Sequence, residues 1–176
     1  MDEVAPGKGS ETVSEAAPGA GGGDGAFWLH VPLEAMSDAQ WESLCDGCGR
    51  CCLQKLEDEG TGEVHFTRIA CRELDPDTAR CRHYPTRFER VPECLSVRPL
   101  DRQKLAWLPS SCAYRRLAEG RGLADWHPLV SGCRGSVAEA GMSVAGGTLD
   151  ERHVPFRRWP EHVIELVDDG RSPQVR

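Results

Sequence analysis

Cysteine spacing is the feature of this chain with the clearest chemistry. Eight of the nine cysteines lie between positions 45 and 112, and the first four form the run Cys45-Asp46-Gly47-Cys48-Gly49-Arg50-Cys51-Cys52. Two residues between successive cysteines let the sulfurs converge on one centre, and the two glycines let the backbone turn and direct its N–H groups at thiolates. Crowded thiolates repel one another unless a cation or protons neutralise them, so this spacing favours a bound metal.

The later cysteines of the block extend this set of candidate ligands. We predict metal ligation by eight side chains: Cys45, Cys48, Cys51, Cys52, Cys71, Cys81, Cys94 and Cys112. Zinc sites usually combine two separated cysteine pairs, whereas C-x-x-C-x-x-C with a remote fourth cysteine is typical of four-iron clusters. Eight sulfurs could also hold two zinc ions, with Cys51 and Cys52 directed to different centres because consecutive side chains diverge. The cofactor is therefore an iron–sulfur cluster or zinc, and the spacing leaves both open.

Other uses of the cysteines fit the sequence less well. Structural disulfides are typical of secreted chains, but the N-terminal segment lacks the basic region and the apolar region of a secretory signal. The cysteine count is also odd, and the adjacent Cys51 and Cys52 cannot form a disulfide with each other without strain. The same reasoning predicts a reducing compartment, the cytoplasm. Cys133 stands apart from the block and fits a buried thiol that packs as a small hydrophobic residue.

An enzyme is the alternative prediction, either a redox-active thiol enzyme or a cluster-dependent enzyme of unknown substrate. The first four residues of the run, Cys45-Asp46-Gly47-Cys48, have the C-x-x-C form of a redox pair. Such motifs normally open a helix after a strand, whereas this one follows a predicted helix. The sequence contains no nucleophile elbow, P-loop, dinucleotide-binding glycine motif or H-E-x-x-H motif. It therefore identifies no catalytic residue and leaves open whether the chain is an enzyme.

Histidines and arginines near the cysteines could complete the site. His83 and His65 are candidate zinc ligands, although a hydrogen-bonded histidine outside the site is commoner. We expect His127, beside Trp126, to be packed with its hydrogen bonds satisfied. The arginines admit two interpretations, either hydrogen bonds to sulfur and compensation of thiolate charge, or ion pairs with acids on a solvated face. These arginines are Arg50, Arg72, Arg82, Arg87 and Arg90.

Motifs distributed along the cysteine block resemble those of a known family. They are residues 41–53, Ala70-Cys71-Arg72, Cys81-Arg82-His83-Tyr84, Arg87-Phe88, Val91-Pro92-Glu93-Cys94 and residues 107–115. The chain resembles the uncharacterised bacterial YcgN family, which is similar to YkgJ-type cysteine-cluster proteins described as zinc- or iron-chelating domains. The resemblance covers residues 27–168 and leaves Cys133 outside the pattern. It implies chelation by Cys45, Cys48, Cys51, Cys52, Cys71, Cys81 and Cys94, with Cys112 as a further candidate. A related cysteine cluster occurs in flagellin lysine methylases, so the resemblance is also compatible with an iron–sulfur role within an enzyme.

Short helices are the elements expected to position these side chains. Ser37-Asp38-Ala39-Gln40 has the form of a capping box and predicts a helix over 37–44 that delivers Cys45 at its C-terminal end. Further helices are predicted over 67–73, 101–107 and 112–119, the last ending at Gly120. No run alternates convincingly enough to predict a strand, although 160–167 fits either a last helix or a strand. The predicted fold is mostly α with irregular loops, a small single domain of short helices organised by metal around the cysteine cluster.

Composition limits the domain organisation and the partners. The 176 residues suffice for one domain with tails. We predict a disordered, acidic, glycine-rich tail over 1–26, a cysteine-cluster metal-binding domain over 27–168 that begins with the apolar anchor Phe27-Trp28-Leu29, and a C-terminal tail over 169–176. A hydrophobic content of 39% predicts a thin core. A net charge of −7 and the lack of a long apolar run argue against nucleic acid and membrane partners.

The function predicted from these observations is metal binding. The chain would act as a structural or electron-transfer module, or as an accessory to another protein, and its direct partner would be a metal ion. Neither the physiological protein partner nor the oligomeric state follows from the sequence.

Overall fold

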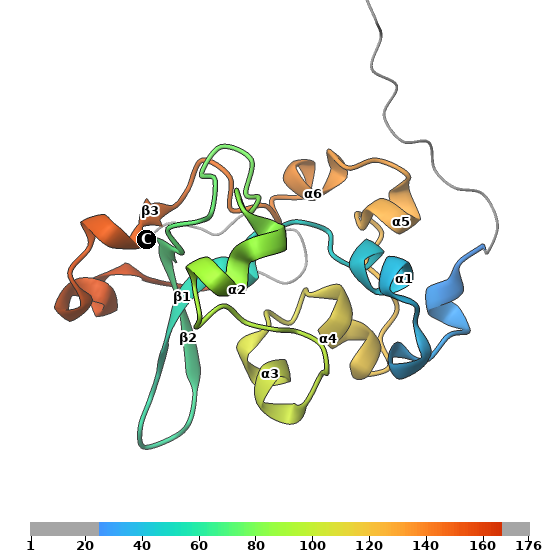
Figure 1. Ribbon diagram of the computed structural model, residues 1–176, viewed down its shortest axis with the longest axis horizontal. Coiled ribbons are helices and arrows are strands. Elements are labelled where there is room, and N and C mark those ends of the chain that lie inside the picture. Colours follow the sequence, from blue (N-terminus) through green and yellow to red (C-terminus); the bar gives the residue numbers. More distant parts are fainter. Residues whose placement is uncertain (1–24, 167–176) are drawn as a thin grey trace, which may run out of the picture.

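The computed structural model describes residues 25–166 of the chain. The predicted C-terminal tail, and all but the last two residues of the predicted N-terminal tail, lie outside the described residues. Figure 1 shows short helices gathered at one end of the molecule and a small sheet with the C-terminal segment at the other. Within the described range, no helix is long and apolar enough to cross a membrane.

The helical elements are all short. The α-helices are α1 (Asp38–Ser43), α2 (Arg87–Arg90), α3 (Arg102–Trp107), α4 (Ala113–Ala118), α5 (Pro128–Ser131) and α6 (Ser136–Glu139). The 3₁₀ helices are η1 (Phe27–Leu29), η2 (Leu33–Ala35), η3 (Arg50–Cys52), η4 (Tyr84–Thr86), η5 (Glu151–His153) and η6 (Phe156–His162). Helices of this length are not stable alone in water, so they depend on packing and on caps.

The caps read from the sequence are present in the structure. At the start of α1 the Gln40 N–H donates to Ser37 Oγ, and the Ser37 N–H donates to Gln40 Oε1, so both halves of the capping box form. Asp101 caps α3 through a 2.9 Å hydrogen bond from the Lys104 N–H. The α4 helix ends just before Gly120, whose φ of 72° is the left-handed conformation that glycine favours. These three predicted helices are confirmed.

Four strands form a mixed sheet. They are β1 (Leu53–Glu57), β2 (Val64–Ala70), β3 (Leu149–Asp150) and β4 (Val163–Ile164). The β2 strand is the common partner of the other three, pairing antiparallel with β1 and β4 and parallel with β3. The ambiguous segment 160–167 therefore supplies a short strand, preceded by η6.

The prediction of a mostly α fold is wrong, because the structure is an α/β fold built around this sheet. The helix predicted over 67–73 is likewise wrong, since most of that range belongs to β2. Thr67 and Ile69 are fully buried while Arg68 between them is exposed, which is the alternation of a strand. The segments that pair with β2 on its second side, β3 and β4, come about 80 to 100 residues later, so local sequence patterns do not reveal them.

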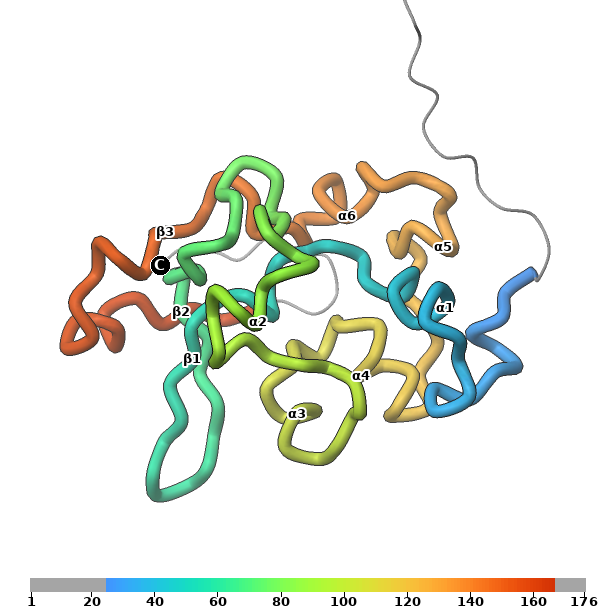
Figure 2. The backbone as a smooth tube through the Cα atoms, in the orientation of Figure 1, coloured from blue at the N-terminus to red at the C-terminus, as the bar shows by residue number. Residues whose placement is uncertain are grey.

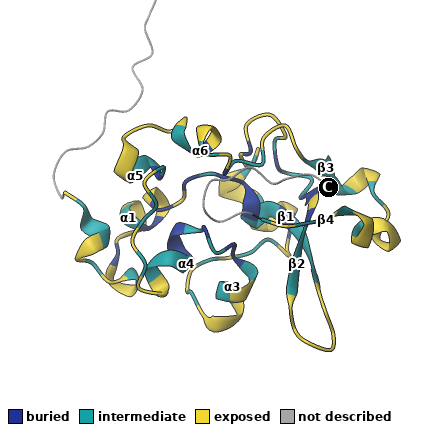
Figure 3. Cartoon of the chain, turned by 180° about the vertical axis from the view of Figure 1, so that it is seen from behind, coloured by how far each residue is buried: buried dark blue, intermediate teal, exposed yellow. Residues whose placement is uncertain are grey.

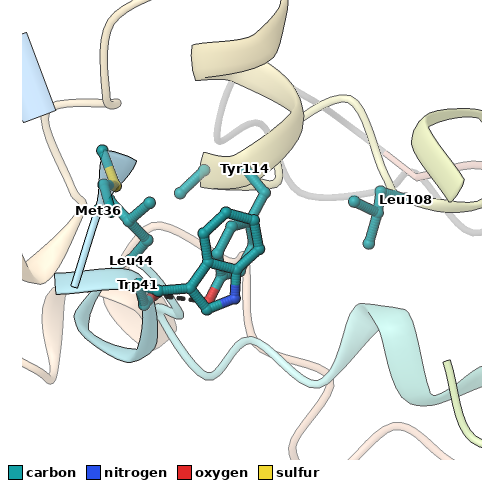
Figure 4. Packing of buried hydrophobic residues seen from close by; sticks show 6 residues of the cluster. Met36, Trp41, Leu44, Leu108 and Tyr114 are labelled. Carbon is teal, nitrogen blue, oxygen red and sulfur yellow. Dashed lines mark hydrogen bonds between the residues drawn. The ribbon is translucent and has the colours of Figure 1, made fainter. Parts of the chain in front are cut away.

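The core is divided into three small clusters, in keeping with the low hydrophobic content. The first contains Met36, Trp41, Leu44, Leu108, Ala113 and Tyr114 (Figure 4). The second contains Cys48, Val137 and Met142. The third contains Leu53, Ala70 and Leu74. Figure 3 shows buried segments near α4 and beside the sheet, surrounded by exposed helix faces.

The N-terminal anchor packs as expected in part. Phe27 and Trp28 form an edge-to-face pair with ring centroids 5.4 Å apart, and both pack against the first cluster. Leu29 instead is 63% exposed. The anchor therefore consists of the two aromatic residues.

Candidate metal centre

A cavity of about 210 Å³ lies where the helices meet the sheet, and all eight predicted ligand cysteines line it. These cysteines come from segments on both sides of the molecule, so the fold gathers residues that the sequence separates widely. All nine cysteines are free thiols in the structure, which does not favour the disulfide alternative.

The loop that carries the first four cysteines crosses from the end of α1 to the start of β1 (Figure 2). Its path requires glycine at position 49, where φ is 75°. A Cβ there would lie 2.7 Å from Val144 Cγ2 and 3.0 Å from the Ala79 carbonyl oxygen. The Val144 N–H also donates to the Cys48 carbonyl at 2.9 Å, which holds the loop against this neighbour.

One set of four cysteines, which we call the helix-side group, is held by the helices. Its members are Cys45, Cys48, Cys51 and Cys112. The first two follow α1, and the last directly precedes α4. The Tyr114 hydroxyl on α4 donates a 2.8 Å hydrogen bond to the Trp41 carbonyl on α1, and their rings pack with centroids 4.7 Å apart (Figure 4). This contact joins the two helices that present the group.

A buried guanidinium strengthens the same junction. Arg50 is 4% exposed, and its Nη1 donates to Ser111 Oγ at 3.1 Å, directly before Cys112. Its Nε donates to the Met142 carbonyl at 2.8 Å and its Nη2 to the Gly141 carbonyl at 3.3 Å. Arg50 therefore ties the cysteine loop both to the start of α4 and to the segment after α6.

The other four cysteines form what we call the sheet-side group, namely Cys52, Cys71, Cys81 and Cys94. Cys52 directly precedes β1 and Cys71 directly follows β2, and the Cys71 N–H donates to the Cys52 carbonyl at 2.9 Å. Leu74 connects Cys71 to Cys81, because the Leu74 N–H donates to the Cys71 carbonyl at 2.9 Å and Leu74 forms a β-bridge with Cys81.

Cys94 reaches this group through α2. Its N–H donates to the Val91 carbonyl at 2.9 Å, directly after the helix. The Arg72 side chain, next to Cys71, donates to the Arg90 carbonyl at the end of α2 at 2.7 Å. Main-chain hydrogen bonds and arginine contacts thus hold the sheet-side group together.

The thiols surround the cavity without forming a finished coordination shell. Within residues 25–166, no three His, Cys, Asp or Glu side chains are already grouped closely enough to hold a metal ion. A change of χ1 rotamer moves a cysteine sulfur while its backbone stays in place. The observed backbone therefore presents the sulfurs to a common space, and their convergence on a metal requires side-chain rotation.

The protein environment keeps most of these thiols protonated. Burial raises the pKa of Cys112 to about 12 and that of Cys48 well above its ordinary value. Cys51 is different, because the Cys52 thiol donates a hydrogen bond to its sulfur and Lys55 is nearby, and its pKa falls to about 7 despite burial. The same hydrogen bond raises the pKa of Cys52. Metal binding by these groups must therefore displace protons.

An acidic side chain inside the cavity is a site residue that the sequence reasoning missed. Asp46 is buried, and its Oδ1 accepts a 2.9 Å hydrogen bond from the Cys48 N–H. Its Oδ2 is buried and has no hydrogen-bond partner among the described residues. A buried carboxylate oxygen without a partner is costly unless a cation lies near it. Its position inside C-D-G-C, between two candidate ligands, was the signal available in the sequence.

Of the two interpretations left open for the arginines, ion pairs and contacts between loops account for the following contacts. The described hydrogen bonds of Arg50 go to carbonyls and to Ser111, while Arg72 pairs with Glu151 at 3.2 Å and Arg82 with Asp75 at 3.6 Å. The Arg87 guanidinium lines the cavity and stacks over the rings of Tyr84 and Phe88. These contacts bind loops together. Burial raises the pKa of the Cys71 and Cys94 thiols, and the nearby charges of Arg72 and Arg87, respectively, partly offset this rise.

The histidines take the commoner role. His83 Nδ1 lies 2.6 Å from Glu73 Oε2, and neither His83 nor His65 lines the cavity. His127 is 1% exposed, its Nδ1 accepts from the Leu129 N–H, and its Nε2 lies 3.1 Å from the Leu44 carbonyl. The expectation of a packed, satisfied His127 is confirmed. Cys133 is exposed and does not line the cavity, so the expectation that it is buried is wrong.

Comparison with known proteins identifies the family. The chain is 50% identical over 142 residues to a UPF0260 protein of Rhodopseudomonas palustris (strain TIE-1), a match covering 80% of this chain and 84% of the relative. The chain belongs to the UPF0260 family. A UPF0260 protein of Shewanella frigidimarina (strain NCIMB 400) is 53% identical over 144 residues, covering 79% of this chain and 97% of the relative. The UPF0260 name states no activity.

A match to a second family description indicates which chemistry this UPF0260 chain shares with other proteins. Residues 44–113 match the CxxCxxCC family, described as "Putative zinc- or iron-chelating domain". The match contains all eight cavity cysteines and excludes Cys133. It confirms the resemblance to zinc- or iron-chelating cysteine-cluster domains, whereas the finer resemblance to the YcgN family stays a prediction. No solved structure matches the chain.

Proposed function

We propose that this protein binds zinc or an iron–sulfur cluster through the eight cysteines that line the cavity, in a reducing compartment such as the cytoplasm. The observation that carries the proposal is that eight thiols from distant segments face one cavity of about 210 Å³. When bound, zinc would supply a closed structural centre, and an iron–sulfur cluster would supply electron transfer.

The chemistry of the cavity fits a bound cation. Neutral thiols need no counterion, but the Asp46 carboxylate oxygen is buried without a hydrogen-bond partner among the described residues, and the Cys51 sulfur has a lowered pKa. A metal would compensate both charges and contribute folding free energy to a protein whose core is divided into small clusters. The match to a zinc- or iron-chelating domain family points in the same direction.

The alternative of a redox-active C-x-x-C enzyme has less support. The motif follows α1 instead of opening a helix after a strand. Desolvation raises the pKa of both Cys45 and Cys48, whereas a nucleophilic thiol of a redox pair needs a lowered pKa. Cys45 is exposed, so the raised pKa of the buried Cys48 is the stronger of these two observations.

Anaerobic purification with elemental analysis and a visible spectrum tests the proposal. Stoichiometric zinc without colour would identify a zinc protein, and iron with an equal amount of sulfide would identify an iron–sulfur protein. We expect Cys48→Ser to lower the metal content and the thermal stability, while the matched control Cys133→Ser changes neither, because Cys133 is exposed and lies outside the cavity. A metal-free protein whose thiols all titrate as free would overturn the proposal.

A further inference from the structure

We infer that the eight cysteines form two separate four-sulfur centres, one made by the helix-side group and one by the sheet-side group, and that the Asp46 carboxylate serves only the helix-side centre. The inference rests on the proposed metal-binding function and adds the number of centres, their ligands and a difference between them.

The strongest support comes from the adjacent residues Cys51 and Cys52. Both belong to η3, and consecutive side chains of a 3₁₀ helix point about 120° apart. Cys51 packs against the first core cluster, which contains Trp41. Cys52 packs against the third, which contains Leu53. Their side chains therefore pack toward different core clusters. The two sulfurs share the Cys52–Cys51 hydrogen bond as thiols, but each side chain has a separate direction in which to rotate toward a metal.

Three of the remaining cysteines divide along the same line. Cys112 packs against the first cluster together with Cys51 and is tied to the cysteine loop through Ser111 and Arg50. On the other side, main-chain contacts link Cys71 to Cys52 and, through Leu74, to Cys81. The contacts that position each set of four thus come from different secondary-structure elements.

Acidic neighbours make the two centres chemically different. Near the helix-side group, Asp46 has an oxygen without a hydrogen-bond partner in the part of the chain that the structure describes. Near the sheet-side group, Glu73 is paired with His83 at 2.6 Å and Glu151 with Arg72 at 3.2 Å. A carboxylate oxygen is a normal zinc ligand and a hard donor beside soft sulfur. The helix-side centre is therefore the one with an additional oxygen available to its metal.

Paired substitutions test the division. We compare the metal content of three double variants with that of the full-length protein: Cys48→Ser with Cys112→Ser, Cys71→Ser with Cys94→Ser, and the mixed pair Cys48→Ser with Cys71→Ser. Each pair within one group should remove half of the metal, because it breaks one centre, and the mixed pair should remove nearly all. Equal loss in all three would overturn the division, and Cys133→Ser controls for the loss of a thiol as such.

A second measurement covers the case in which these variants do not fold. Metal release from the unmodified protein to a chelator should proceed in two phases of equal amplitude. Asp46→Asn keeps the acceptor for the Cys48 N–H and removes the charge, and it should change the rate of one phase about 10-fold or more. A single phase would overturn the division, and equal changes in both phases would overturn the role of Asp46. A protein that holds no metal would overturn the proposed function instead.

Discussion

The two groups of cysteines carry the same ligand chemistry but are positioned by different forces. The helix-side group adjoins the largest hydrophobic cluster, in which Leu44 is fully buried and Trp41 is 6% exposed. The sheet-side group adjoins the smaller third cluster and is otherwise held by the main-chain hydrogen bond between Cys71 and Cys52 and by partly exposed ion pairs such as Arg72–Glu151. Apolar burial contributes more free energy than exposed ion pairs do. The helix side should therefore keep its structure without metal better than the sheet side.

Metal removal should have the largest effect. Structural zinc contributes roughly 10–16 kcal/mol of binding free energy in small zinc domains, and its loss should loosen the domain. We expect amide hydrogen exchange to increase more in residues 71–94 than in α1 and α4, because packing around Tyr114 persists on the helix side. Hydrogen-exchange mass spectrometry with and without chelator measures this. Uniform exchange along both sides would contradict the comparison.

Truncation of the helix-side cluster should have the next largest effect. Leu44→Ala removes a fully buried side chain next to Cys45 and should lower the free energy of unfolding by about 2–5 kcal/mol. Leu29→Ala is the matched control, since Leu29 is 63% exposed, and it should change the value by less than about 0.5 kcal/mol. Urea denaturation measures both. Similar effects at the two positions would show that the first cluster does not support the fold.

A pH-dependent effect is expected on the helix side as well. Burial lowers the pKa of His127, while an unfolded chain has the ordinary histidine pKa of about 6.5. The unfolded state therefore binds a proton at this histidine more readily than the folded state does. The contribution of the neutral His127 to the free energy of unfolding is complete above about pH 6.5 and declines as the pH falls below that value. We expect the protein to lose more stability between pH 7.5 and 5.5 than His127→Asn does, measured by thermal denaturation. The exposed His30 gives the control His30→Asn, which should follow the unmodified protein.

The contact that joins α1 to α4 should have a moderate effect. Tyr114→Phe removes the 2.8 Å hydrogen bond to the Trp41 carbonyl but keeps the ring packing, and it should cost about 1 kcal/mol. If this contact positions Cys112, the Tyr114→Phe variant should also release metal to a chelator faster, in only one of the two kinetic phases. Ser43→Ala, which removes an exposed hydrogen bond to the Gln40 carbonyl outside the cavity lining, serves as the control in the same assays.

A surface ion pair should have the smallest effect. Asp38→Asn weakens the 2.7 Å contact with Arg98, in which the Asp38 side chain is 99% exposed. Exposed pairs contribute roughly 0–1 kcal/mol, and this contribution falls at high salt. Urea denaturation at low and high salt measures it. A loss comparable to that of Leu44→Ala would contradict the view that burial dominates on the helix side.

Local signals explain which parts of this molecule could be predicted from its sequence. The capping box at Ser37 and the cap at Asp101 act within three residues, and both helices appear where the sequence placed them. The eight cysteines stood out by type and spacing, and all of them reach the cavity. Their use as metal ligands stays a prediction.

The parts that the sequence did not reveal depend on distant contacts. The helix predicted over 67–73 is mostly strand β2, and two of the three partners of β2, namely β3 and β4, lie far along the chain. The burial of Asp46 and the contacts of Arg50 with Ser111 and Met142 likewise arise only after folding. Cys133 was expected inside because isolated cysteines usually pack, but no cluster of the core lies over it.

The contacts of Arg50 also bear on any attempt to isolate a minimal metal-binding fragment. The match to the chelating-domain family ends at residue 113, but Arg50 donates to the carbonyls of Gly141 and Met142. A fragment cut at the end of that match would deprive a guanidinium in the protein interior of two acceptors, immediately beside Cys51. Metal titrations on such a fragment would therefore measure binding to a cysteine loop that has lost these contacts. The smallest fragment that keeps them must extend beyond residue 142.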